Sequence, residues 1–352
     1  MKEIVKFKHP DLSEGVFKLA PNVKLEEVKE DGIAPENFHA LSIYPEYFKV
    51  NNKWLLATNS RMDTVCVVDD TLGSEKLYIK EFRNLKKKDK VVIGRTEDAS
   101  EGIYVYTEGF LNESEDKETF AFRDSRSRET AYSKDYDDLY DLLRFERENN
   151  GYVTVVLGMT LLTDKRSQKS LTELINKGYI DAIFAGTDTV ALDLLQSSEE
   201  NLDISESNLI RVINKVNNYG SIKEYISNEK LSNSFVKSCY ENNVNLVIPG
   251  TIRDIYPLPE TINDVYKAQD IMRQNQMKTT SVIMLGSILY SIATGNMTPS
   301  YNEFDESIRP IYIYTVDIQE FAVNKLADRG SLTAVSIVTN VKDFIENVNN
   351  SL

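Results

Sequence analysis

The stretch Ala182-Ile183-Phe184-Ala185-Gly186-Thr187 joins a continuous apolar run to a glycine and a hydroxyl residue. A short apolar run of this kind is typical of a strand buried on both faces of a parallel sheet. Similar runs recur through the second part of the chain, at residues 153–157, 246–248, 282–285, 311–316 and 334–338. Segments with helical periodicity separate them, for instance 171–177, 209–226 and 265–273. This alternation predicts an α/β fold with a Rossmann-like parallel sheet covered on both faces.

The first part of the chain has a different pattern. Short strand-like segments such as Tyr47-Phe48-Lys49-Val50 are separated by turn clusters such as Asn51-Asn52. A polar segment with helical spacing follows from about Tyr132 and ends at Asn149-Asn150-Gly151. A chain of 352 residues is long enough for two hydrophobic cores. We therefore predict a smaller β-rich domain over residues 1–130 and a Rossmann-like domain over residues 131–352.

Composition excludes several classes of protein. The net charge of −14 disfavours a nucleic-acid surface, because phosphate binding needs an excess of Lys and Arg. The two cysteines lie far apart and indicate no disulfide framework or metal cluster. Both histidines, His9 and His39, lie in the N-terminal part, which argues against a zinc site or a Ser-His-Asp triad in the larger domain. No apolar run approaches the ~20 residues that span a bilayer, and the charged N-terminus is unlike a signal peptide. We expect a soluble, cytoplasmic protein without a metal.

Four predicted strands end in a glycine followed within two positions by a hydroxyl residue: Gly158-Met159-Thr160, Gly186-Thr187, Gly250-Thr251 and Gly286-Ser287. Beyond the carboxyl ends of parallel strands lies the usual ligand crevice, where glycine lets a ligand approach the backbone and helix N-termini bind phosphate. The alternative is that these glycines only make tight turns. The chain contains no G-x-G-x-x-G motif, so a dinucleotide site must be built from several strand ends.

An acid follows the strand at 311–316, namely Asp317. A carboxylate at a strand end is suited to the two hydroxyls of a ribose and repels a 2′-phosphate, which favours NAD over NADP. The alternative is that Asp317 is an N-cap of the next helix.

Two further segments carry functional groups. In Gly250–Pro259, Arg253 is suited to grip a carboxylate or a pyrophosphate, and Asp254 is suited to pair with an ammonium or to act as a base. The alternative is an internal Arg253–Asp254 salt bridge. The segment 291–299 is predicted to be a helix end that presents the amide of Asn296 near the same crevice; by itself it is an ordinary C-cap.

These segments, in this order, resemble the LOR/SDH bifunctional enzyme conserved-region family. That family includes archaeal-type ornithine cyclodeaminases and the C-terminal part of cyanobacterial arginine dihydrolases. The resemblance runs from about Asp31 to Phe344 and includes Met62-Asp63. The other matching segments are 31–35, 178–186, 211–214, 220–222, 250–259, 264–270, 291–299, 316–318 and 325–331.

The resemblance implies an NAD-binding domain, preceded by a β-rich region that contributes to the substrate side. In cyclodeaminase members, bound NAD⁺ takes a hydride from the α-carbon of ornithine to give an imine. The δ-amine then attacks the α-carbon, ammonia leaves, and the hydride returns to give proline. The implied catalytic residues are Asp63, Arg253 and Asp254. The resemblance also implies a cofactor lining made of Gly186, Thr187, Asp188, Asn296, Met297 and Asp317, to which the strand-end pattern adds Gly250 and Thr251. The expected partner is a small amino acid or amine, and we expect a homo-oligomer.

The chain departs from the family pattern at several polar positions. Thr187-Asp188 replaces the usual Asn-Ala, and Tyr290 stands where histidine is common. The departures keep two alternatives open. One is an oxidoreductase or imine-handling enzyme for another amino acid or amine. The other is a catalytically inactive dinucleotide-binding sensor or partner subunit.

Overall fold

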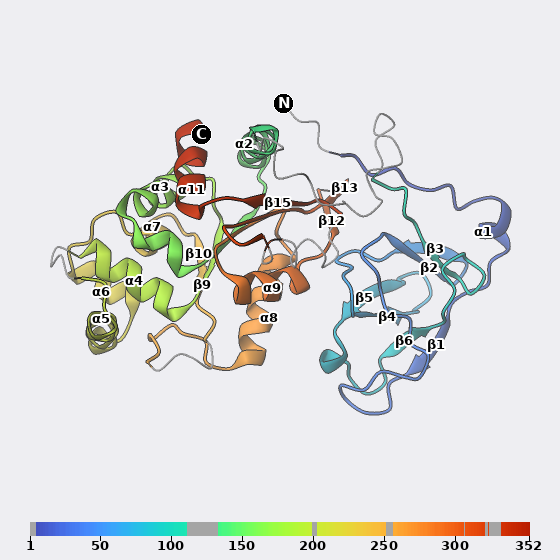
Figure 1. Cartoon of the computed structure of the whole chain (residues 1–352). Helices are drawn as coiled ribbons and strands as arrows, with labels where there is room; N and C mark the ends of the chain where they lie inside the picture. Colours follow the sequence, from blue (N-terminus) through green and yellow to red (C-terminus); the bar gives the residue numbers. More distant parts are fainter. Residues whose placement is uncertain are drawn as a thin grey trace.

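The computed structural model describes residues 5–110, 133–198, 203–250, 256–305, 307–320, 323 and 332–352 (Figure 1). Its largest sheet has six parallel strands in the order β10-β9-β8-β11-β14-β15. These strands are β8 (Val153–Leu157), β9 (Ala182–Ala185), β10 (Asn245–Val247), β11 (Ser281–Leu285), β14 (Tyr312–Asp317) and β15 (Ala334–Val338). Strands and helices alternate along the chain, which confirms the predicted α/β class with a Rossmann-like sheet.

Successive residues of each strand belong to different cores, because side chains alternate between the faces of a sheet. Val155 and Leu157 pack into the larger hydrophobic cluster, whereas Val156 between them packs into a smaller one. Both faces are therefore apolar and covered, as the continuous apolar runs predict.

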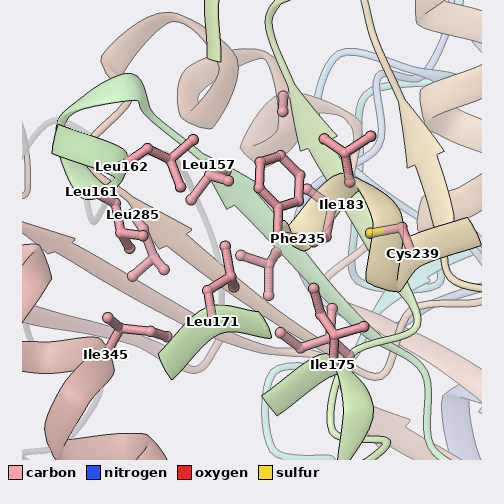
Figure 2. Close-up of a cluster of buried hydrophobic side chains, with 14 of the residues drawn as sticks. Leu157, Leu161, Leu162, Leu171, Ile175, Ile183, Phe235, Cys239, Leu285 and Ile345 are labelled. Atoms are coloured by element: carbon pink, nitrogen blue, oxygen red, sulfur yellow. The ribbon is translucent and has the colours of Figure 1, made fainter. Parts of the chain in front are cut away.

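The larger cluster joins one face of the sheet to most of the described helices, and Figure 2 shows part of its buried side chains. It includes Leu171, Ile175, Phe235, Cys239 and Ile345. The helices on this side are α2 (Ser133–Glu148), α3 (Lys165–Asn176), α4 (Thr187–Ser197), α5 (Glu206–Tyr219), α6 (Ile222–Asn228), α7 (Phe235–Glu241) and α11 (Val341–Ser351), together with the 3₁₀ helix η2 (Met159–Thr163). The smaller cluster packs α8 (Val265–Gln276) and α9 (Ile288–Met297) on the opposite face, through Met272 and Met297.

The N-terminal part is built from two antiparallel sheets, at the right of Figure 1. One has the order β1-β6-β4-β5 and the other β3-β2-β7. Their strands are β1 (Lys24–Glu27), β2 (Glu46–Val50), β3 (Lys53–Leu56), β4 (Val65–Asp69), β5 (Lys76–Lys80), β6 (Lys90–Ile93) and β7 (Ile103–Val105). Two short helices, α1 (Gly15–Leu19) and the 3₁₀ helix η1 (Phe82–Asn84), complete this part. Phe48 and Val92 are fully buried in its main core.

The two parts meet through a hairpin and through ion pairs that Glu81 and Arg83 form with Arg273 and Asp270 of α8. The hairpin consists of β12 (Tyr301–Phe304) and β13 (Ser307–Pro310). Tyr301 is fully buried, and its hydroxyl donates to the carbonyl oxygen of Ala57 at 2.6 Å. The boundary that we predict at 130/131 falls in residues 111–132, outside the described residues. In the described part of the chain, no helix is both long and apolar enough to cross a membrane.

Candidate functional site

The centre of the parallel sheet is the point at which the chain reverses its direction of travel across the sheet. From β8 the chain moves outward to β9 and β10, then returns to β11 on the other side of β8 and moves outward to β14 and β15. In open α/β sheets, the carboxyl ends of the two strands at such a switch point flank the ligand crevice. The expected crevice therefore lies beyond Leu157 and Leu285.

Two glycines form the floor of this crevice. A Cβ atom on Gly158 would lie 2.0 Å from the carbonyl oxygen of Gly286, so no other residue fits there without a backbone shift. Gly286 has a left-handed backbone with φ of +60°, and its nearest possible side-chain contacts are Val341 and Thr160. A side chain at Gly286 would therefore be strained and would extend among residues that line the crevice.

A cleft of about 700 Å³ opens over this floor. Its wall contains the exposed apolar side chains of Ile288 (44% exposed), Leu289 (58% exposed) and Ile318. The half-buried Met159 and the buried Val341 also line it. The helices α4, α9 and α11 begin at the cleft. Among the described residues, neither N-cap Gly186 nor N-cap Ser287 supplies a side-chain cap to its helix. Apolar walls combined with helix N-termini suit a ligand that has both planar rings and phosphate groups.

Four predicted cofactor residues line the cleft, namely Gly186, Thr187, Asp188 and Asp317. Thr187 is buried, and its hydroxyl lies 3.2 Å from that of Thr261, whereas Asp188 in the first turn of α4 is exposed. Asp317 is half-buried at the end of β14. Its Oδ1 atom accepts from the amide of Gln319 at 2.8 Å, so the carboxylate supports the turn through one of its two oxygens.

Tyr290 narrows the cleft on the side of β9. A Cβ atom on Gly186 would lie 2.7 Å from the Tyr290 hydroxyl, which donates to the carbonyl oxygen of Pro249 at 3.0 Å. The adjoining Gly250 donates its amide hydrogen to Ile262 at 3.0 Å and is not among the residues that line the cleft. The predicted residues Thr251, Arg253 and Asp254 lie outside the described residues.

Sequence reasoning missed the cation in this cleft, Lys342. It stands in the first turn of α11, which Asn340 caps by accepting from the Lys342 amide at 3.0 Å. The strand before it, β15, does not end in glycine, so the strand-end pattern did not include it. The Asn340 cap at the end of a strand-like run is the signal that would have pointed to this position.

The remaining two predicted cofactor residues lie elsewhere. Asn296 lines a second cavity of about 220 Å³, which we call the interdomain cavity. Its lining residues are Arg61, Met62, Asp63, Thr64, Glu81, Arg273, Gly295, Asn296 and Thr298. Met297 instead points into the smaller core and is only 7% exposed. Neighbouring residues of a helix differ in direction by about 100°, and here Asn296 faces the cavity while Met297 faces the core.

The interdomain cavity also contains the predicted catalytic residue Asp63. Asp63 is exposed at the cavity and has a left-handed backbone with φ of 59°. Beside it, the carboxylate of Glu81 pairs with Arg61 from its own domain and with Arg273 of α8, at 2.5 Å from the Arg273 Nε atom. Burial raises the pKa of Glu81, but the guanidinium groups of Arg61 and Arg273 outweigh it and hold that pKa below its usual range.

No group of three or more His, Cys, Asp and Glu side chains in the described ranges is arranged to hold a metal ion.

Comparisons with known proteins agree with this geometry. A model of the family described as "Arginine dihydrolase ArgZ-like, C-terminal, Rossmann fold" matches residues 138–348. An ornithine cyclodeaminase from Methanocaldococcus jannaschii is 31% identical over 338 residues, covering 92% of this chain and 76% of that protein. The bifunctional arginine dihydrolase/ornithine cyclodeaminase AgrE from Nostoc sp. is 29% identical over 336 residues, covering 92% of this chain but 46% of AgrE.

Two solved structures are also similar. The conserved putative LOR/SDH protein from Methanococcus maripaludis superimposes with a TM-score of 0.81 at 29% identity, over 94% of this chain and 98% of that one. The ternary complex of AgrE with ornithine and NAD⁺ superimposes with a TM-score of 0.57 at 27% identity, over 95% of this chain and 46% of that one. The match over residues 138–348 and the 31% identity with an ornithine cyclodeaminase confirm the resemblance seen in the sequence: this chain belongs to the ArgZ-like C-terminal Rossmann-fold family.

Proposed function

We propose that this chain is an NAD-dependent enzyme of the ornithine cyclodeaminase type, which converts ornithine to proline and ammonia. The observation that carries the proposal is the cleft over Gly158 and Gly286 at the switch point of the sheet. Support comes from relatives named ornithine cyclodeaminase and from AgrE, whose solved complex contains ornithine and NAD⁺.

The residues of the cleft fit a nicotinamide dinucleotide. The volume of about 700 Å³ is within the range of cofactor sites. The glycine floor admits close approach to the backbone, and the first turns of α4 and α9 offer N–H groups to a pyrophosphate. Asp317 uses Oδ1 on Gln319, which leaves Oδ2 to accept from a ribose hydroxyl. Lys342 adds a positive charge to the lining of the same cleft, which suits a phosphate group.

Bound NAD⁺ would supply the hydride acceptor and donor for the α-carbon of ornithine, so that the reaction has no net redox change. The protein's own part is to bind the amino acid, hold its protons and exclude water. We propose Asp63, Arg253 and Asp254 as the residues that do this, as the family resemblance implies. Homo-oligomerisation and a cytoplasmic location stay predictions from the sequence.

The test is an assay of purified protein with ornithine, with and without NAD⁺. We expect proline and ammonia in equal amounts, only when NAD⁺ is present, and without accumulation of NADH. Accumulation of NADH with ornithine or another amine would contradict the cyclodeaminase proposal and favour an oxidoreductase. Calorimetric binding of NAD⁺ without any turnover would instead favour a catalytically inactive dinucleotide-binding subunit.

A further inference from the structure

The interdomain cavity and the dinucleotide cleft lie along the same helix, α9. Ile288 at the start of α9 lines the cleft, and Asn296 near the end of the same helix lines the cavity. Tyr290 also lines the cleft and Gly295 also lines the cavity, so roughly 7.5 Å of helix separates the two linings. The cavity is therefore a second compartment, and residues of both domains form its wall.

One wall of the cavity carries a surplus of positive charge. Arg61 is only 4% exposed and Arg273 only 14%, yet both pair with the same carboxylate oxygen, Oε1 of Glu81. The second carboxylate of the network, Asp270, lies 3.5 Å from Arg273 but also 2.6 Å from a third guanidinium, that of Arg83. At the cavity wall, two guanidinium groups therefore share the single carboxylate of Glu81, while Arg83 pairs with Asp270 outside the cavity. A surplus of positive charge on these two largely buried guanidinium groups favours an anionic ligand.

The two guanidinium groups have donors left for such a ligand. A guanidinium carries five N–H donors. Arg61 donates one of them to Glu81 and another to the carbonyl oxygen of Asn59 at 3.1 Å. Glu81 also accepts from Asn84 at 2.9 Å, so it is held from two sides and keeps the guanidinium groups in place. Glu81 is therefore a positioning residue for the two arginines.

Another residue of the cavity lining supplies the opposite charge. Asp63 is exposed at the cavity, and the amide of Asn296 lines it as well. A ligand with a carboxylate at the arginines and an ammonium at Asp63 would balance both walls. The volume of about 220 Å³ corresponds to roughly seven water molecules at ~30 Å³ each, which suits a small amino acid and is too small for a dinucleotide.

We propose that the interdomain cavity binds an α-amino acid, with its carboxylate on Arg61 and Arg273 and its ammonium on Asp63. The inference rests on the proposed function, in which that amino acid is ornithine. It assigns the carboxylate to a pair of arginines from two domains, in place of Arg253. The bound carboxylate would thereby link Arg61 of one domain to Arg273 of the other, the same two residues that Glu81 links.

The chain offers a matched control. Arg83 joins the same two domains through Asp270 but does not line the cavity. Arg83→Gln removes an interdomain ion pair and leaves the cavity wall intact. Arg61→Gln and Arg273→Gln each leave Glu81 with one arginine partner, so the buried carboxylate stays paired in both variants.

The experiment is calorimetric titration of the full chain with L-ornithine and with 1,4-diaminobutane, which is ornithine without its carboxylate. We expect the wild type to prefer ornithine. Arg61→Gln and Arg273→Gln should weaken ornithine binding by roughly 10-fold or more, as expected for a lost hydrogen bond between charged groups, and should abolish this preference. Arg83→Gln should keep the wild-type affinity for ornithine and the preference for ornithine over 1,4-diaminobutane. The affinity for NAD⁺ should be unchanged in all three variants.

Because the experiment measures binding and not turnover, failure of the proposed function and failure of this inference give different results. A wild type that binds ornithine through these arginines but makes no proline would contradict the proposed function and leave the inference standing. Unchanged ornithine affinity in both cavity variants, with a loss in Arg253→Gln, would overturn the inference, and so would a wild type that binds no ornithine. With turnover present, a raised KM at unchanged kcat is expected, because the carboxylate contact is equal in the ground and transition states.

Discussion

Gly158 and Gly286 approach so closely that a Cβ atom on Gly158 would lie 2.0 Å from the carbonyl oxygen of Gly286. Their strands, β8 and β11, are neighbours at the switch point of the sheet, and the Gly158 amide donates to Leu285 at 2.8 Å. The contact therefore keeps the floor of the cleft free of side chains.

Gly286→Ala should weaken NAD⁺ binding as well as stability. The new methyl group would extend toward Val341 and Thr160 at the cleft, and the left-handed backbone costs a non-glycine residue ~1–2 kcal/mol. Gly178→Ala is the control, since Gly178 has a similar φ of +75° and open space around it. Thermal unfolding should show a comparable loss for both variants, while calorimetry should show a loss of NAD⁺ affinity only for Gly286→Ala. Equal NAD⁺ affinity in the two variants would contradict the proposed position of the cofactor.

Asp317→Ala should lower NAD⁺ affinity by roughly 10-fold or more, because a charged acceptor for a ribose hydroxyl is lost. It should also reduce the preference for NAD⁺ over NADP⁺, since the repulsion of a 2′-phosphate disappears.

Asp164→Ala serves as the comparison for Asp317→Ala. Asp164 also accepts from the amide two residues on, that of Arg166, at 2.8 Å, but it does not line the cleft. Its loss should cost ~1 kcal/mol of stability, the usual value of an N-cap, with no effect on the cofactor. An Asp317→Ala variant that behaves like Asp164→Ala would show that Asp317 only supports its turn.

The dependence of stability on pH should contain a distinct contribution from Asp193. Asp193 is fully buried and accepts from Gln168 at 2.7 Å and from Ser234 at 2.6 Å. Burial raises its pKa to about 6 in spite of these hydrogen bonds. In the unfolded chain the same group titrates near ~3.9. The native state therefore holds the proton more tightly, so the stabilising contribution is present below about pH 4 and is lost as the pH rises through about 6.

Asp193→Asn cannot titrate, so the comparison isolates this contribution. Denaturant unfolding at about pH 4.5 and about pH 7 should show the wild type losing roughly 2 kcal/mol relative to the variant as the pH rises, at ~1.4 kcal/mol per pKa unit. A stability difference that is constant across this range would mean that Asp193 titrates normally.

The sequence predicted those features of the fold and site that are local. The apolar runs and their terminal glycines identify the strands and the crevice, because burial on both faces and close backbone approach leave a pattern within a few residues. Family resemblance added Asp63, but sequence reasoning gave no sign that it lies beside Arg61, Glu81 and Arg273.

The ion pairs that Glu81 forms with Arg61 and Arg273 could not be predicted from local sequence patterns. Glu81 and Arg273 are far apart in the sequence, and only the docking of two domains brings them together. Sequence reasoning also grouped Asn296 with Met297 in one crevice, although helical geometry directs one into the interdomain cavity and the other into the core.

The central claim is that the chain removes the α-amino group of ornithine and returns the α-hydride to the product. The most direct measurement uses ornithine labelled with ¹⁵N at the α-amino group and with deuterium at the α-carbon, incubated with the purified protein and NAD⁺. We predict ¹⁵N in the ammonia, none in the proline, and deuterium retained at the α-carbon of proline. Label-free ammonia, proline that carries ¹⁵N, or the absence of proline would contradict the account.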